Sequence, residues 1–209
     1  VRRREGRDRA SGPFGDHRRI LDHLKDEQPR VWEWFASGKF RADHAEAVHV
    51  QLLKSSYRME REAHADLYAP ADEAVRILGL TDPLTLYQAQ DPSGQLNASY
   101  SFVPGAIHVL LTGPVATRLT PEELRALFGP ELSHHAFCSA WDGECFCAEQ
   151  AVNGMAADPD GHDAHGETAR LFNLYTELFA DRGSLAVVRD HRTVVSMLAK
   201  VALGADQPD

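Results

Sequence analysis

Residues 119–135 read LTPEELRALFGPELSHH, and this stretch decides how the central part of the chain folds. Thr120 is a residue of the helix N-cap type, Pro121 suits the first helical position, and Glu123 completes a capping box. The sequence therefore predicts a helix that begins at Thr120 and continues to about Cys138.

Glu131 and His134 in this helix occupy two positions of the motif H-E-x-x-H. In that motif the two histidines share one helix face and bind a metal, and the glutamate acts on the bound water. Pro130 stands at the first histidine position and has no donor atom for a metal. A proline inside a helix also removes a backbone hydrogen bond, here to the carbonyl of Ala126, at a cost of roughly 3 kcal/mol.

The pattern before this helix predicts a small antiparallel sheet of about three strands. Runs 84–90, 98–103 and 107–112 are short and rich in β-branched and aromatic residues. The turn sequences Asp-Pro-Ser-Gly at 91–94 and Pro-Gly at 104–105 separate them.

Most of the remaining chain reads as helix, so the predicted fold class is α+β and mostly helical. The predicted helices are 17–37 with a break at Pro29, 43–66, 71–78 ending at Gly79, about 144–156, a segment from about 167, and about 190–204. A polar loop is expected between 156 and 167.

The order of these segments resembles that of the HtpX-like zinc metallopeptidases, a gluzincin family, over about residues 70–203. The resemblance is carried by an Asn97-Ala98 strand, a strand that ends in Thr112-Gly113, the helix with Glu131 and His134, and the later stretch Glu177-Leu-Phe-Ala-Asp181-Arg. It implies a zincin-like α+β domain and hydrolysis of peptide bonds by a metal-activated water.

The resemblance also implies a role for each matching residue. His134 and Glu177 would be zinc ligands, Glu131 the general base, and Asp181 a carboxylate that orients a ligating imidazole. The strand that begins at Asn97 and Ala98 would pair with an extended peptide substrate.

Pro130 departs from the family pattern, and three functions stay open. With two ligands where three are usual, zinc is expected to bind weakly or not at all, and hydrolysis to be impaired. The first function is a zinc endopeptidase in which Pro130 is tolerated. The second is an inactive pseudopeptidase that binds peptides or regulates. The third is a metalloenzyme with a rebuilt site that uses His134, Cys138 and Glu177, although Cys138 also fits a small buried hydrophobe.

Composition indicates a soluble globular chain of 209 residues, with 43% hydrophobic and 25% charged residues. The net charge of −9 disfavours general nucleic-acid binding. No apolar run is long enough to span a bilayer, and no secretory signal is evident, so we expect a cytoplasmic protein. Three cysteines in one short stretch fit reduced thiols.

The predicted organisation has three parts: a disordered basic tail at 1–16, an N-terminal helical extension at 17–66 and a metallopeptidase-like domain at 67–209. The expected partner is a peptide or protein substrate, and the sequence sets no oligomeric state. Histidines in the extension, His44 and His49 among them, are interpreted as surface or half-buried side chains.

Overall fold

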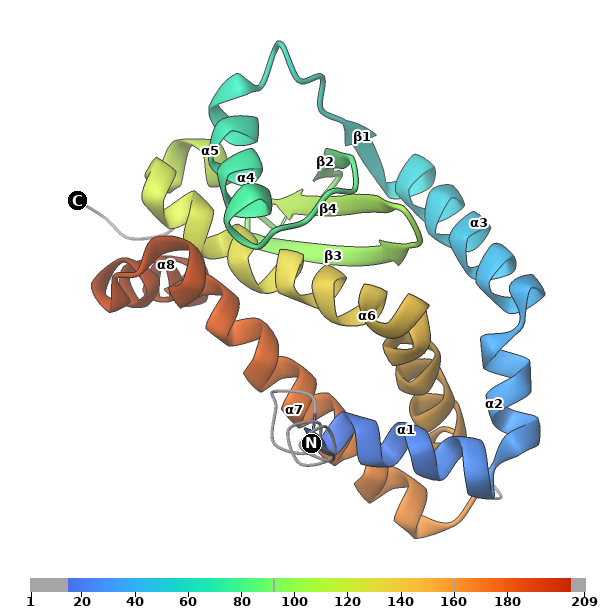
Figure 1. Cartoon of the computed structure of the whole chain (residues 1–209). Helices are drawn as coiled ribbons and strands as arrows, with labels where there is room; N and C mark the ends of the chain where they lie inside the picture. Colours follow the sequence, from blue (N-terminus) through green and yellow to red (C-terminus); the bar gives the residue numbers. More distant parts are fainter. Residues whose placement is uncertain (1–14, 92, 160, 204–209) are drawn as a thin grey trace, which may run out of the picture. The chain divides into compact units, whose positions relative to one another are not determined.

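A computed structural model describes residues 15–91, 93–159 and 161–203 (Figure 1). Most of the predicted basic tail therefore lies outside the described residues. The chain divides into two compact units, formed by the described parts of Val1–Ala42 with Phe137–Phe179 and of Asp43–Ala136 with Ala180–Asp209. The predicted domain boundaries at residues 16 and 66 stay predictions.

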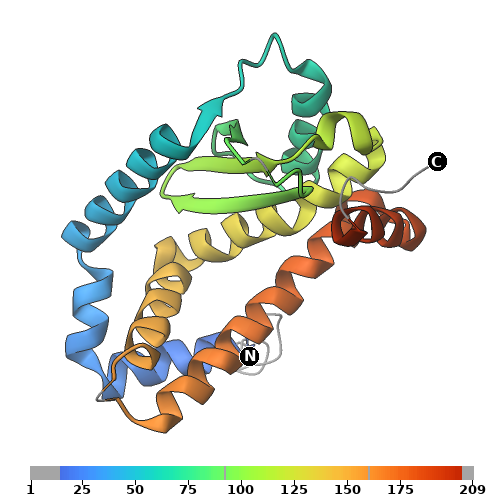
Figure 2. The ribbon, with the colours of Figure 1, turned by 180° about the vertical axis from the view of Figure 1, so that it is seen from behind.

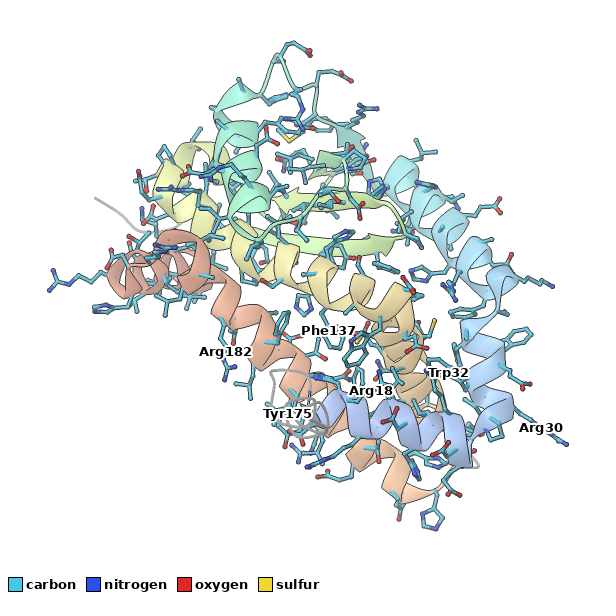
Figure 3. All side chains as sticks on the ribbon, viewed as in Figure 1. Arg18, Arg30, Trp32, Phe137, Tyr175 and Arg182 are labelled. Carbon is cyan, nitrogen blue, oxygen red and sulfur yellow. The ribbon has the colours of Figure 1, made fainter. Side chains whose placement is uncertain are left out.

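The first unit is helical and has an aromatic core. It contains α1 (Gly15–Glu27), α2 (Pro29–Ala36) and parts of two longer helices, α6 (Pro121–Ala156) and α7 (Asp163–Val188). Pro29 begins α2, as predicted, because proline is accepted in the first helical turn. Phe137 and Tyr175, both labelled in Figure 3, lie with ring centroids 4.6 and 6.2 Å from that of buried His17.

The second unit is built around a four-stranded sheet. Its elements are α3 (Gly38–Ser55, from residue 43 onward), β1 (Ser56–Arg58), α4 (Ala65–Ile77), β2 (Leu84–Ala89), β3 (Asn97–Val103), β4 (Ala106–Thr112), α5 (Val115–Arg118), the first part of α6, the last part of α7, and α8 (His191–Leu203). The core of this unit joins Leu86, Val109 and Leu111 of the sheet to Phe128 and Leu132 of α6.

The sheet has strand order β1-β2-β4-β3 (Figure 2). The three predicted strands are present, and β3 and β4 form the predicted antiparallel hairpin. However, β2 pairs with β4 in parallel, so the sheet is mixed. The α+β class is confirmed, and the parallel pair is a feature that local turn signals could not reveal.

One helix prediction is wrong at its C-terminal end. The segment 43–66 was expected to be a single helix, but α3 ends at Ser55 and residues 56–58 form β1. The Ser56 hydroxyl donates to the carbonyl of Leu52, and Tyr57 lies opposite Gln88 in the ladder with β2. The strand therefore depends on a partner 31 positions away, which helical patterning within the segment does not report.

The capping box at the start of α6 is confirmed. The Thr120 backbone N–H donates to the Glu123 carboxylate at 2.8 Å, and the Glu123 N–H donates to the Thr120 hydroxyl at 3.2 Å. The helix is interrupted at 140–143, where Trp141 and Asp142 have φ of 52° and 57°. This agrees with the predicted end near Cys138 and restart near residue 144. No helix of the described residues is long and apolar enough to cross a membrane.

Candidate functional site

The predicted motif residues lie on α6 within the second unit. Pro130, Glu131 and His134 are all half-buried. Helical geometry continues through Pro130, because the non-helical dihedrals inside α6 are confined to 140–143. Glu131 and His134 therefore lie about one turn apart in the continuous helical part of α6 before the interruption at 140–143, as the sequence predicts.

A serine from α7 compensates for the hydrogen bond that Pro130 cannot make. The Ser184 hydroxyl donates to the Ala126 carbonyl at 2.7 Å, and both residues are buried. Ala126 is the residue whose carbonyl would otherwise accept the N–H of position 130. An unpartnered buried carbonyl costs about 1–3 kcal/mol, so the penalty of roughly 3 kcal/mol expected from the sequence is an upper limit.

Two glycines allow α6 and α7 to approach closely enough for this contact. A Cβ atom placed on Gly129 would lie 2.5 Å from the backbone nitrogen of Ser184. A Cβ atom on Gly183 would collide with the Ser133 hydroxyl and with the Gly129 backbone. The backbones of the two helices thus touch at Gly129 and Gly183, which brings Ser184 beside Ala126.

Glu177 and Asp181 occupy α7 four residues apart and are exposed. Residues with this spacing share one helix face, as the sequence predicts. Glu177 belongs to the first compact unit, and Asp181, Glu131 and His134 belong to the second. The convergence of Glu177 with His134 on one metal stays a prediction.

His135 connects α6 to the sheet and to the loop before β2. Its side chain is 1% exposed; Nε2 lies 2.8 Å from the Asp82 carboxylate, and Nδ1 lies 3.1 Å from the Tyr100 hydroxyl. Burial lowers the pKa of His135, although the hydrogen bond and charge of Asp82 act in the opposite direction. In the neutral ring, Nε2–H donates to the carboxylate, so Nδ1 accepts from Tyr100.

Histidines of the predicted N-terminal extension also contact the sheet. The His49 and His108 rings meet edge to face at 5.5 Å, and His108 Nδ1 lies 3.3 Å from the Tyr87 hydroxyl. Burial, and after it the charges of His49 and His135, lower the pKa of His108. His44 Nε2 lies 3.1 Å from the Phe102 carbonyl. The extension therefore packs on β3 and β4 through imidazoles.

Cys138 is a buried residue of the first unit, and its thiol donates a hydrogen bond to a carboxyl group. Its Sγ donates to Glu149 Oε2 at 3.7 Å. Burial first, and then the charge of Glu149, raise the pKa of Cys138 well above its usual value. Burial likewise raises the pKa of Glu149. A metal is bound by the thiolate, so this environment favours the small buried hydrophobe over the rebuilt metal site.

Strand β3 forms one edge of the sheet (Figures 1 and 2). It contains the predicted residues Asn97, which is exposed, and Ala98, which is buried. The Asn97 side-chain oxygen accepts the N–H of Ala98 at 2.9 Å. The edge position that the resemblance requires of this strand is therefore present.

The donor set does not fit a catalytic zinc. Such a zinc usually has three protein ligands, and Pro130 offers no donor atom at the position of one of them. Residues 15–91, 93–159 and 161–203 contain no group of three or more His, Cys, Asp or Glu side chains that could hold a metal ion.

Sequence reasoning missed Ser184, Asp82, Tyr100 and the contact made by His44. Each of them makes a hydrogen bond with a partner that is distant in sequence. Ser184 and Ala126, for example, are 58 positions apart. The only local hint was Pro130 itself, which leaves one known carbonyl in need of a donor.

Comparison of the chain with protein-family models, with curated proteins and with solved structures gives no match.

Proposed function

We propose that this chain binds an extended peptide at the edge strand β3, on a scaffold of the HtpX-like zinc metallopeptidase type that no longer hydrolyses its ligand. The observation that carries the proposal is the accommodation of Pro130. Pro130 leaves the Ala126 carbonyl without a backbone donor, and the Ser184 hydroxyl donates to this carbonyl instead. The helix α6 stays helical through Pro130.

This accommodation favours a binding module over an impaired enzyme. An unrelieved proline would strain the helix that presents Glu131 and His134. Because Ser184 supplies the missing donor, the missing ligand at position 130 is compatible with a stable scaffold. A scaffold that keeps its edge strand while lacking a metal ligand retains the means to bind a peptide without the means to cleave it.

The orientation of β3 supports peptide binding. Phe102 directs its carbonyl to His44, away from β4. Main-chain groups alternate along a strand, so Ala98 and Tyr100 face the same way as Phe102. An added peptide strand requires this outward orientation of N–H and C=O groups.

Fluorescein-labelled casein tests the proposal, because it is an extended polypeptide whose binding and cleavage are measured separately. We expect the unmodified chain to bind casein, seen as increased fluorescence anisotropy, and to release no fragments with or without added zinc. We expect Pro130→His to bind zinc through the introduced imidazole, His134 and Glu177, and to cleave casein. Adding Glu131→Gln to this variant should abolish cleavage and leave zinc bound.

Each result has a distinct meaning. Zinc-dependent cleavage by the unmodified chain would show an active peptidase and refute the loss of hydrolysis. Failure of casein to bind would refute the peptide-binding function. A Pro130→His variant that binds no zinc would refute the assignment of His134 or Glu177 as ligands.

An active zinc endopeptidase is the second candidate function. It is favoured by the joint presence of Glu131, His134, Glu177 and Asp181 at the family positions. A relic that had drifted without constraint has no obvious reason to keep all four residues.

A further inference from the structure

We propose that His44 is a specificity-determining residue, which ends the stretch of β3 with which a peptide can pair. This inference rests on the proposed peptide-binding function. It identifies what limits the length of the bound segment, and so assigns a role to the helix α3 that lies outside the family resemblance.

The Phe102 main chain faces outward from the edge of the sheet. In the β3–β4 ladder Phe102 lies opposite Ile107, and the Ile107 N–H donates across the sheet to the Pro83 carbonyl at 2.9 Å. Ile107 thus turns its main-chain groups away from β3. In an antiparallel pair the opposite residue does the same, so Phe102 faces outward at the edge.

A histidine side chain contacts the outward carbonyl of Phe102. The His44 imidazole reaches it from α3, with Nε2 at 3.1 Å. A carbonyl oxygen only accepts, so Nε2 carries the hydrogen. Burial lowers the pKa of half-buried His44. The ring therefore stands where the N–H of a pairing peptide would donate.

A side chain also contacts the outward main chain at the opposite end of β3. The outward N–H of Ala98 is accepted by the Asn97 side chain at 2.9 Å. Side chains thus contact both ends of the outward-facing positions Ala98, Tyr100 and Phe102. Because outward positions recur every second residue, a peptide pairs over a segment centred on Tyr100 and gains nothing by extending past Phe102.

The experiment measures affinity against peptide length. The probes are fluorescein-labelled, acetylated Thr-Val repeats of about four, six and eight residues, chosen because alternating β-branched residues favour the extended strand. For the unmodified chain we expect affinity to level off before the longest peptide. For His44→Ala we expect the longest peptide to bind about fivefold more tightly, since one further hydrogen bond forms.

Two variants serve as controls. His44→Gln keeps an N–H donor for the Phe102 carbonyl and should behave as the unmodified chain does. His49→Ala removes another imidazole of α3, whose ring packs edge to face on His108 of β4. It should also leave the length dependence unchanged. Thermal unfolding checks that each variant is folded.

A measurement on the unmodified chain completes the test and does not depend on a variant. The His44 ring signals in a proton–nitrogen NMR spectrum should keep their positions when the longest peptide binds. A large shift would mean that the peptide displaces His44, and this would overturn the inference. Equal length dependence for His44→Ala and the unmodified chain, or an equal gain in His49→Ala, would also overturn it. If neither casein nor any repeat binds any variant, the proposed function itself fails.

Discussion

Removing the Ser184 hydroxyl tests whether α7 compensates for Pro130. In Ser184→Ala the Ala126 carbonyl stays buried and loses its 2.7 Å donor, while Pro130 still supplies no N–H. A buried acceptor without a partner costs about 1–3 kcal/mol, and we expect the free energy of unfolding to fall by that amount.

Pro130→Ala provides the second side of a double-mutant cycle. The alanine N–H can donate to Ala126, so this single change should stabilise the chain by about 1–2 kcal/mol, less than the roughly 3 kcal/mol of an uncompensated helix-interior proline. In this background Ser184→Ala should cost little, about 0.5 kcal/mol or less, because the carbonyl keeps a donor. The expected coupling, which is the difference between these two costs, is therefore about 0.5–3 kcal/mol.

Urea unfolding followed by far-ultraviolet circular dichroism gives the four free energies. Thr168→Ala is a control on the same helix, since it removes a hydroxyl that donates to the Ala164 carbonyl at an exposed position. Its effect should be independent of Pro130. If Ser184→Ala and Pro130→Ala add to within about 0.3–0.5 kcal/mol, the two sites are independent and the compensation is refuted.

Four further changes test the fold. Gly129→Ala places a Cβ atom 2.5 Å from the backbone nitrogen of Ser184, and we expect urea unfolding to show a loss of about 1–3 kcal/mol. Gly166→Ala on α7 meets nothing within 4 Å and should stabilise by up to about 1 kcal/mol; equal effects of the two changes would contradict the close crossing. Thr120→Ala removes the capping hydroxyl and should lower the unfolding free energy by about 1 kcal/mol, whereas no loss would show that the capping box contributes nothing. Burial lowers the pKa of His17 below 6.5, which favours the neutral ring in the folded state. The stability that this neutral ring contributes is therefore fully present above about pH 6.5, and it is lost as the pH falls through the folded-state pKa. The unfolding free energy should therefore fall as the pH is lowered from 7.5 to 5, and it should fall less steeply in His17→Gln. The same pH dependence in both proteins would show that His17 does not contribute in this way.

Features of the fold that depend on neighbouring residues were predictable. The capping box of Thr120 and Glu123, the break at Pro29 and the hairpin of β3 and β4 follow from interactions over a few residues. The same holds for the candidate site. Glu131 and His134 are three positions apart on a helix, and the absence of a donor atom at Pro130 is visible in the sequence.

Pairings between distant segments were not predictable. The segment 56–58 has helical surroundings, yet it becomes a strand because β2 offers it a ladder. Strand β4 pairs with β3 on one side and with β2, in parallel, on the other, and the turn between β3 and β4 does not fix the direction in which β2 runs. A turn sequence sets the geometry of the two strands that it joins. It does not indicate which other strand pairs with the free side of that hairpin.

The sequence by itself determined that position 130 cannot ligate a metal and that Ala126 loses a helical donor, because both follow from the chemistry of proline. Only the tertiary structure decided how the chain tolerates this loss. The donor comes from Ser184, 58 positions along the chain, and reaches the carbonyl because Gly129 lacks a side chain at the crossing of α6 and α7. Likewise, His44 reads in the sequence as one more polar residue of a helix. Its contact with the Phe102 carbonyl exists because folding brings α3 to the edge of the sheet, and no local pattern encodes a contact across 58 positions.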